Sequence, residues 1–406
     1  MADAFVLDYV RTPRGKGSSR GSLAGVRPLD LVVRLQRALV ERTGLDPERV
    51  EDVIIGSASQ VDDQGGNLAR TATLLAGWGD HVPGGAVNRF CASGIDAVAQ
   101  VSARIRAGEL QLAVAGGVES VSRVPMFADR APLWTDAEVI RQVGSVHMGI
   151  AADLNATLEG YTREQLDAYG VETQRKAAEA WERGAYAGSV VPVELPDGTL
   201  FDRDELVRPD TTAEGLAALP PAFAELGAQG QDAIALAAHP EAGRIEHLHT
   251  VGTSPSLADG AALLLLGDAA AAEAAGLRPR ARVVACATAA VDPVLMLTAG
   301  QAAVERAIAR AGLTPADIDV FEFAEAFAAL CLTFRRDLDA GPDRLNPNGG
   351  TIAMGHAFGA TGAIMVGGCV DELERREGRY GVAAVSGAAG LGVAVVLERV
   401  SEKGAA

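Results

Sequence analysis

The stretch Asn88-Arg89-Phe90-Cys91-Ala92-Ser93-Gly94-Ile95-Asp96-Ala97-Val98 decides the fold, because an extended segment gives way there to a helix. Ile95 and Val98 are spaced for one buried helix face, and Gly94 lets another group lie close to the backbone. A thiol at a helix N-terminus feels the positive end of the helix dipole, so we expect the pKa of Cys91 to lie below its usual value of about 8.5. Cys91 is therefore a candidate nucleophile. The alternative is a small buried hydrophobe, as most free cysteines are.

The composition is that of a large α/β protein. The chain has 406 residues, 48% of them hydrophobic, and a formal net charge of -17. This length suggests about two or three domains, and the negative charge argues against nucleic acid or an anionic membrane surface as a partner. The sequence contains no apolar run of the roughly 18 residues that a membrane helix needs, and its start does not resemble a signal peptide. We expect a cytoplasmic protein.

The cysteines and histidines form no metal-ligand pattern. The four cysteines, at positions 91, 286, 331 and 369, stand far apart without a CxxC pair. We therefore expect neither a metal site nor a disulfide framework. The densest basic group contains Arg11, Arg14, Lys16 and Arg20, which suits either a polyanionic small ligand or a solvated loop.

Two similar runs of strands and helices stand at the two ends of the chain. The first has strand patterns at 4–10, 53–57 and 112–120 and helix patterns at 28–43 and 66–77. The second has strand patterns at 283–287 and 320–323, a helix pattern at 299–311, and a closing segment at 383–390. Alternating strands and helices are typical of a sheet covered by helices. We interpret the two runs as a duplicated α/β unit.

Residues 121–250 interrupt this rhythm and are more polar. Thr162-Arg163-Glu164-Gln165 is a capping box that opens a helix running towards Gly184, and Arg208-Pro209-Asp210-Thr211-Thr212 indicates another helix start. We expect an inserted subdomain, which divides the chain into 1–120, 121–250 and 251–406.

The duplication relates Cys91 to His356, which precedes a second helix rich in small residues. Packing of the two halves about a pseudo-two-fold axis would bring both helix starts to one cleft, where an imidazole could take the proton of the thiol before attack on an acyl carbon. The alternative for His356 is a histidine whose hydrogen bonds are satisfied at a helix end.

These residues resemble the thiolase family, in particular the acetyl-CoA acyltransferases that include β-subunits of fatty-acid oxidation complexes. The resemblance runs nearly end to end. It rests on Arg11-Thr12-Pro13-Arg14, on 88–94, on Gly116-Gly117-Val118-Glu119-Ser120, on 208–212, on Asp259-Gly260-Ala261, and on Asn348-Gly349-Gly350 leading to Gly355-His356. It implies a five-layered αβαβα fold with a loop domain over the active site. It also implies coenzyme A thioesters as substrates without a bound cofactor, and a homodimer or homotetramer, with a fatty-acid oxidation subunit as a further candidate partner.

The resemblance assigns roles to individual residues. Cys91 would carry the acyl group, and His356 would activate it. Backbone N–H groups at Cys91 and Ala388 would form one oxyanion hole, while His147, Met148, Ser254 and Ser256 would contact the substrate. Glu119 and Asp259 lie in matched motifs, where we expect turn and helix-start hydrogen bonds.

Four positions depart from the family pattern. The cysteine that serves as acid and base in the family is Ser386 here, and the asparagine that helps form a second oxyanion hole is Ala324. Pro255 and Ala357 replace a serine and a proline. A serine hydroxyl ionises too weakly to act as a base unaided, and losing an oxyanion donor typically costs on the order of a hundredfold to a thousandfold in rate. Acylation of Cys91 should therefore survive, whereas ordinary thiolysis is in question.

Three hypotheses follow. The first is a working acyl-CoA C-acyltransferase in which a water, Ser386 or Glu325 relays the proton. The second is a divergent condensing enzyme or acyltransferase that uses a decarboxylative substrate or a non-carbon acceptor. The third is a non-catalytic subunit that pairs with an active thiolase.

Overall fold

A computed structural model describes residues 2–401. The N-terminal half contains β1 (Phe5–Arg11), β2 (Gly15–Lys16), α1 (Pro28–Thr43), β3 (Asp52–Gly56), α2 (Leu68–Ala76), β4 (Gly85–Val87), α3 (Ser93–Arg106), β5 (Leu112–Ser120), β8 (Ala258–Gly267) and α11 (Ala269–Ala274). The C-terminal half contains β9 (Ala281–Ala290), α12 (Ala299–Ala311), β10 (Val320–Phe323), α13 (Ala328–Asp337), α14 (Thr351–Met354), α15 (Phe358–Arg376), β11 (Tyr380–Gly387) and β12 (Leu391–Arg399).

The strand order confirms the duplication. The sheet runs β10-β11-β12-β9-β1-β8-β5-β3-β4, so that β9, β12, β11 and β10 repeat the order β1, β8, β5 and β3 outward from the centre. The pairing directions repeat as well: β8 is antiparallel to β1 and β5, and β12 is antiparallel to β9 and β11. The innermost pair, β1 with β9, joins the halves over a short stretch, in which Phe5 pairs with Arg282 and Val6 with Ala281.

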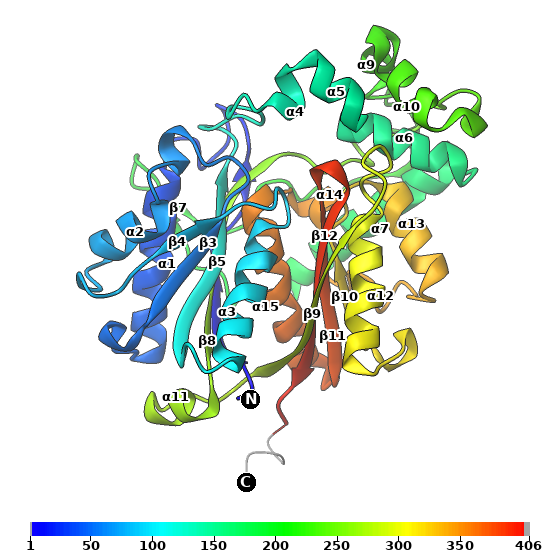
Figure 1. The fold of residues 1–406 in the computed structure, drawn as a ribbon. Helices are drawn as coiled ribbons and strands as arrows, with labels where there is room; N and C mark the ends of the chain where they lie inside the picture. The colour runs from blue at the N-terminus through cyan, green and yellow to red at the C-terminus, as the bar shows by residue number, and fades with distance from the viewer. Residues whose placement is uncertain (1, 402–406) are drawn as a thin grey trace.

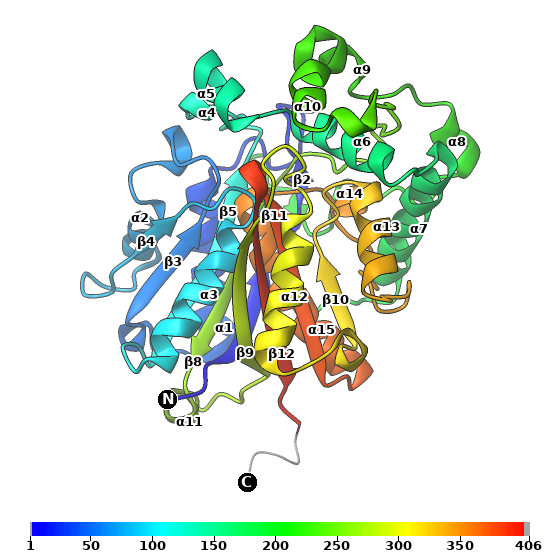
Figure 2. The ribbon, with the colours of Figure 1, turned by 45° about the vertical axis from the view of Figure 1, so that its right-hand side comes forward.

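Five layers result from this arrangement, as the resemblance implies. Helices α3 and α15 form the central layer and share one core with the inner faces of both halves of the sheet. Helices α1 and α2 cover the outer face of the N-terminal half, and α12 and α13 cover the outer face of the C-terminal half. Figure 1 shows this succession, with α3 and α15 side by side at its centre, and Figure 2 shows α3 and α12 in front of the sheet after a turn of 45°.

Most local predictions are confirmed. The helix expected at 299–311 has these bounds, and the capping box at Thr162 opens α7 (Arg163–Glu182). One boundary differs: the chain returns to the N-terminal half in β8, which pairs with β1 and β5, and enters the C-terminal half only at β9. The division predicted at residue 251 is therefore too early, because a continuous apolar run does not reveal which strands it pairs with.

The inserted segment lies over one end of the two halves of the sheet. Besides α7, it contains α4 (Pro132–Thr135), α5 (Ala137–Val143), α6 (Met148–Leu158), β6 (Val193–Glu194), β7 (Leu200–Phe201), α8 (Ala213–Ala217), α9 (Ala224–Leu226) and α10 (Asp232–Ala238). Helices α4, α5, α6, α9 and α10 stand at the top of the molecule in Figure 1, above the start of α3. This segment thus covers the end of the fold at which Cys91 lies.

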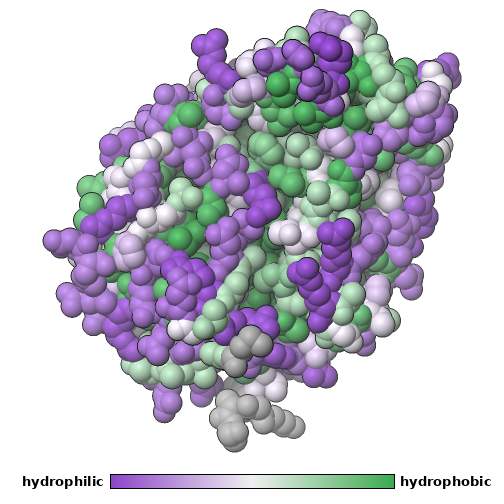
Figure 3. Space-filling view, viewed as in Figure 1, coloured by the Kyte–Doolittle hydropathy of each residue, from purple (hydrophilic) through white to green (hydrophobic). Residues whose placement is uncertain are grey.

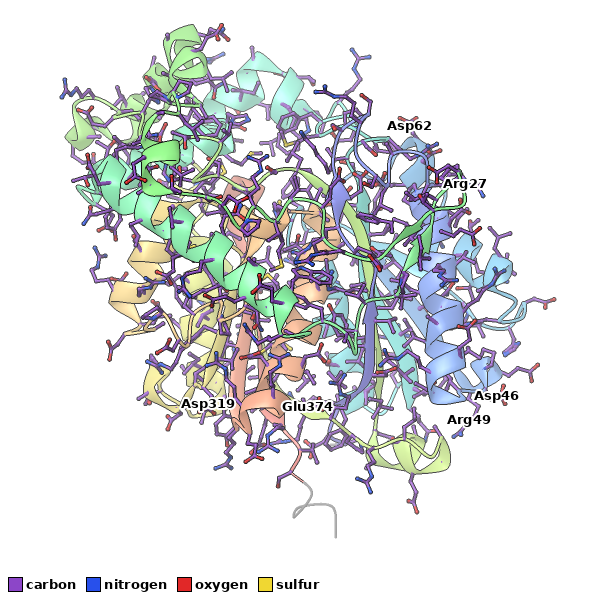
Figure 4. The ribbon with its side chains drawn as sticks, turned by 180° about the vertical axis from the view of Figure 1, so that it is seen from behind. Arg27, Asp46, Arg49, Asp62, Asp319 and Glu374 are labelled. Carbon is purple, nitrogen blue, oxygen red and sulfur yellow. The ribbon has the colours of Figure 1, made fainter. Side chains whose placement is uncertain are left out.

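The face of the molecule seen in Figure 3 is mostly polar. Figure 3 shows apolar side chains gathered just below the inserted helices, and polar ones over much of the rest of that face. Seen from behind, Arg27 at the start of α1 and Asp46 beyond its end lie at the periphery (Figure 4). Among residues 2–401, no helix is both long and apolar enough to cross a membrane.

Candidate active site

The starts of α3 and α15 are in direct contact. A Cβ added to Gly94 would lie 2.3 Å from the backbone oxygen of Gly359, and one added to Gly362 would lie 2.6 Å from the backbone nitrogen of Ile95. Such distances leave no room for a side chain, so only glycine allows this approach. The glycines therefore hold the segments of Cys91 and His356 together.

Residues with unusual backbone angles precede both candidate catalytic residues. Phe90 has a φ of 51° and Gly355 a φ of 95°, each in the region that L-residues rarely occupy. Glycine adopts this region without strain, whereas Phe90 is strained there; such strain is frequent at functional sites, where the surrounding structure enforces it. The backbone of His356 forms two hydrogen bonds. Its N–H donates to the carbonyl of Ser256 at 2.8 Å, and its carbonyl accepts from the N–H of Ala258 at 3.1 Å. The backbone of His356 is thus held in place by the loop before β8.

Cys91 and His356 line one cavity, which we call the thioester hollow. Its space measures about 850 Å³, part of it open to solvent. Among the residues that the sequence predicts for the site, the hollow is lined by Cys91, His147, Met148, Ser254, His356, Ser386 and Ala388. Residues from the two halves and from the inserted segment meet here.

The thiol of Cys91 is less acidic than the sequence predicts. Burial, and next the negative charge of Glu119, raise its pKa to about 12. The prediction of a lowered pKa is therefore wrong, because a charged thiolate would lose its hydration in this half-buried position. At neutral pH the sulfur is a thiol, so its attack on an acyl carbon needs a base.

His356 is a neutral imidazole at the same pH. Burial, and next the nearby cation of Arg14, lower its pKa to about 4. Nδ1 lies 2.8 Å from the hydroxyl of Thr361. The tautomer with its proton on Nδ1 donates to that hydroxyl and leaves Nε2 free to accept a proton. The site therefore combines a neutral thiol with a neutral base.

Arg14 reaches this site from a buried ion-pair group. Arg11 and Arg14 both bind the carboxylate of Asp204, and a guanidinium nitrogen of Arg14 also lies 3.3 Å from the carbonyl oxygen of Gly355. Both arginines are buried, so neither the solvated loop nor the anion site considered for them describes their position. They instead attach the inserted segment to the residue before His356.

Ser386 forms two buried hydrogen bonds to the backbone. Its hydroxyl donates to the carbonyl of Leu297 at 2.6 Å and accepts from the N–H of Gly300 at 2.9 Å. Gly300 lies in the first turn of α12, where backbone N–H groups lack helical partners. The hydroxyl thus caps α12, and its own proton is already shared with a carbonyl.

We predict that Ser386→Ala lowers the free energy of unfolding by about 1–3 kcal/mol, because both backbone groups lose a buried partner. Acylation of Cys91 should persist. Chemical denaturation and intact-protein mass spectrometry measure the two effects. Ser254→Ala is the matched control: Ser254 also borders the hollow, and its buried hydroxyl has no hydrogen-bond partner among the described residues, so this variant should leave stability nearly unchanged. Unchanged stability of Ser386→Ala would contradict the capping role.

Three other proposed participants lie elsewhere. Ala324 and Ser256 border two other cavities. Glu325 is fully buried, and its carboxylate accepts hydrogen bonds from Tyr169, Thr173 and the N–H of Ile352. Because these bonds occupy it away from the hollow, Glu325 is not placed to relay a proton.

The remaining predicted residues hold local structure beside the hollow. His147 caps α6 by accepting the N–H of Gly149 at 3.1 Å, and burial lowers its pKa, so it is neutral. Glu119 accepts from the N–H of Gly359 at 2.9 Å and from that of Ala58 at 2.8 Å. The expected helix-start hydrogen bond of Glu119 is therefore present, and it ties the start of α15 to the N-terminal half.

A second cavity adjoins Cys91 and was not predicted. We call it the aromatic pocket; it is lined by Phe90, Phe127, Asp129 and Trp134, among others, and measures about 410 Å³. The rings of Phe90 and Phe127 lie 5.6 and 4.9 Å from that of Trp134. Aromatic residues within a polar inserted segment are the sequence signal that could have revealed it.

A thiol and an imidazole on one hollow of a duplicated fold define an acyl-transferring enzyme, because acyl transfer needs a nucleophile and a base within reach of one carbonyl. Comparison with known proteins gives the same class. Residues 4–230 match the model of the thiolase N-terminal domain and residues 277–399 that of the thiolase C-terminal domain. The chain belongs to the thiolase family.

Individual relatives cover the whole length. The chain is 38% identical to a β-ketoadipyl-CoA thiolase of Escherichia coli and 37% identical to a 3-ketoacyl-CoA thiolase of Colwellia psychrerythraea, each over 98% of this chain and 100% of that protein. The crystal structure of the Bacillus anthracis acetyl-CoA acetyltransferase superimposes with a TM-score of 0.85 at 31% identity, covering 98% of this chain and 99% of that one. The chain is thus an acyl-CoA acyltransferase of the thiolase type.

Proposed function

We propose that this enzyme cleaves 3-ketoacyl-CoA thioesters through a covalent acyl-Cys91 intermediate. The observation that carries the proposal is that Cys91 and His356 line the same hollow. Nε2 of His356 takes the thiol proton as the sulfur attacks the 3-keto carbon. Cys91 and Ala388 both border the hollow, and their backbone N–H groups would stabilise the resulting oxyanion.

Proton transfer is coupled to bond formation. With the thiol pKa raised to about 12 and the imidazole pKa lowered to about 4, a free thiolate–imidazolium pair is strongly disfavoured. The proton therefore moves as the carbon–sulfur bond forms and negative charge passes to the carbonyl oxygen. When the carbon–carbon bond breaks, the departing carbanion of acetyl-CoA needs a proton, and imidazolium of such low pKa is a strong acid that returns it. Coenzyme A then attacks the acyl-cysteine: Nε2 of His356 takes its thiol proton and passes it to the departing sulfur of Cys91, and the shortened acyl-CoA is released.

This route explains how thiolysis survives without a cysteine at position 386. The titratable side chains bordering the hollow are Cys91, His147 and His356, and His147 already accepts a backbone hydrogen bond through Nδ1. His356 is thus the group best suited to carry the proton in both directions.

Intact-protein mass spectrometry after incubation with acetyl-CoA, malonyl-CoA or 3-oxohexanoyl-CoA tests the proposal. We expect an acyl adduct on Cys91 from the acetyl and 3-oxoacyl thioesters, and its loss on adding coenzyme A. An adduct formed only from malonyl-CoA would favour the decarboxylative alternative. Failure of every thioester to label Cys91 would contradict the proposal and favour a non-catalytic subunit.

We also propose a cytoplasmic homo-oligomer that needs no bound cofactor. The edge of the sheet formed by β4, three residues long and directly before the Cys91 segment, is a candidate contact between copies. Light scattering coupled to size-exclusion chromatography would measure the state.

A further inference from the structure

We infer that the acyl chain carried by Cys91 is uncharged and apolar, and that Asp129 in the aromatic pocket disfavours chains ending in a carboxylate. The inference rests on the proposed function, since it concerns the group that Cys91 transfers. It separates two kinds of substrate that the names of the relatives suggest: a β-ketoadipyl group ends in a carboxylate, whereas a simple 3-ketoacyl group does not.

The position of Cys91 limits where an acyl chain can lie. Cys91 borders two cavities, the thioester hollow and the aromatic pocket, and Met126, Met148 and Phe358 also border both. A chain attached to the sulfur must extend into one of these spaces. The charges along both cavities therefore decide which chain ends are accepted.

Neither cavity supplies a cation to a carboxylate. Among the described residues that line them, there is no arginine or lysine, and the titratable bases are His147 and His356. Burial keeps both imidazoles neutral near pH 7. Ser254 offers a hydroxyl without a partner among the described residues, but one neutral hydroxyl does not replace the counter-ion that a carboxylate removed from water requires. The walls suit methylene groups or a ring instead.

The carboxylate of Asp129 would also repel a carboxylate at the end of the acyl chain. Its Oδ1 accepts the indole N–H of Trp134 at 2.9 Å and the backbone N–H of Ala131 at 3.4 Å. Neither partner carries a positive charge, so the carboxylate is held in position at the pocket without being neutralised. Like charges placed together disfavour the wrong ligand, which is how negative selection works in specific sites.

The experiment compares two thioesters that differ only at the chain end. The value of kcat/KM for thiolysis is measured with 3-oxohexanoyl-CoA and with 3-oxoadipyl-CoA, which has the same carbon chain closed by a carboxylate. We expect a preference of at least about 100-fold for 3-oxohexanoyl-CoA. A ratio near one, or a preference for 3-oxoadipyl-CoA, would overturn the inference while leaving the proposed function intact.

Two variants test the role of Asp129 and of the missing cation. Asp129→Asn keeps an oxygen for the indole N–H but removes the charge, and should shrink the preference by about tenfold or more. Glu138→Gln, an exposed carboxylate of the same segment, is the matched control and should leave the ratio unchanged. Equal ratios for the two variants would overturn the assignment of Asp129.

Met126→Arg is the second variant, and it remains informative if Asp129→Asn folds poorly. Met126→Arg adds a cation beside both cavities and should raise the relative rate with 3-oxoadipyl-CoA by about tenfold or more. No gain in a folded Met126→Arg protein would count against electrostatic selection. If neither thioester is cleaved and neither acylates Cys91, the proposed function fails and the inference fails with it.

Discussion

Cys91→Ala is expected to lower kcat/KM for thiolysis by about 10⁴-fold or more and to abolish the acyl adduct. The expected loss is large because the two serines that border the hollow, Ser254 and Ser386, carry hydroxyls that ionise far more weakly than a thiol, and the hydroxyl of Ser386 is bound to backbone groups. Steady-state thiolysis and intact-protein mass spectrometry measure the two effects.

Cys286→Ala is the matched control for this variant. Cys286 is also half-buried, and burial raises its pKa to about 12, but it lies in β9 away from the lining of the hollow. It should retain full activity and a full adduct. An adduct of unchanged size on Cys91→Ala protein would show that another residue carries the acyl group.

His356→Ala is expected to lower kcat/KM by about 10²–10⁴-fold, the usual range for removal of a general base. The thiol pKa of about 12 makes the rate depend strongly on His356, because little thiolate forms at neutral pH without a base. The rate of adduct formation should fall in parallel, since proton removal belongs to the acylation step. His81→Gln, an exposed histidine outside the hollow, should behave as the unaltered protein.

The pH dependence provides a sign test of the same assignment. The base works only when unprotonated, so with a pKa lowered to about 4 it stays active as the pH falls from 8 to about 5. The fold itself becomes less stable over the lower part of this range. Between pH 6.5 and 4 the histidine of the unfolded chain binds a proton that the buried one does not. The free energy of unfolding therefore decreases as the pH is lowered through this range. An acid limb of kcat/KM centred near pH 6.5 in stably folded protein would contradict the low pKa.

Local signals in the sequence were sufficient for most elements. The capping box at Thr162 and the apolar spacing of 299–311 mark helices that depend on near neighbours along the chain. The boundary between the halves could not be placed in this way, because β8 belongs to the first half only through its pairing with β1 and β5. A single apolar run predicts a strand but does not indicate which distant strands it pairs with.

In the candidate site, too, some residues could be predicted from local sequence patterns and others could not. The repeated pattern of small residues before a helix relates Cys91 to His356 without any coordinates, and the structure finds both on one hollow. The role of Ser386 could not be predicted, since its partners Leu297 and Gly300 lie more than 80 positions away. The aromatic residues of the inserted segment are the one signal of the aromatic pocket, and no motif relates Asp129 or Trp134 to Cys91.

Residue order and type alone establish a doubled α/β scaffold of the thiolase family, with a thiol in one half and an imidazole in the other. The scaffold and the two groups can be predicted from periodicity and motifs, which are properties of the sequence itself. The three-dimensional arrangement decides how those groups behave. Burial beside Glu119 makes the thiol weakly acidic against the pull of the helix dipole, and burial near Arg14 keeps the imidazole neutral. Proton affinity depends on the solvent and charge around a group, and only the folded protein brings these together.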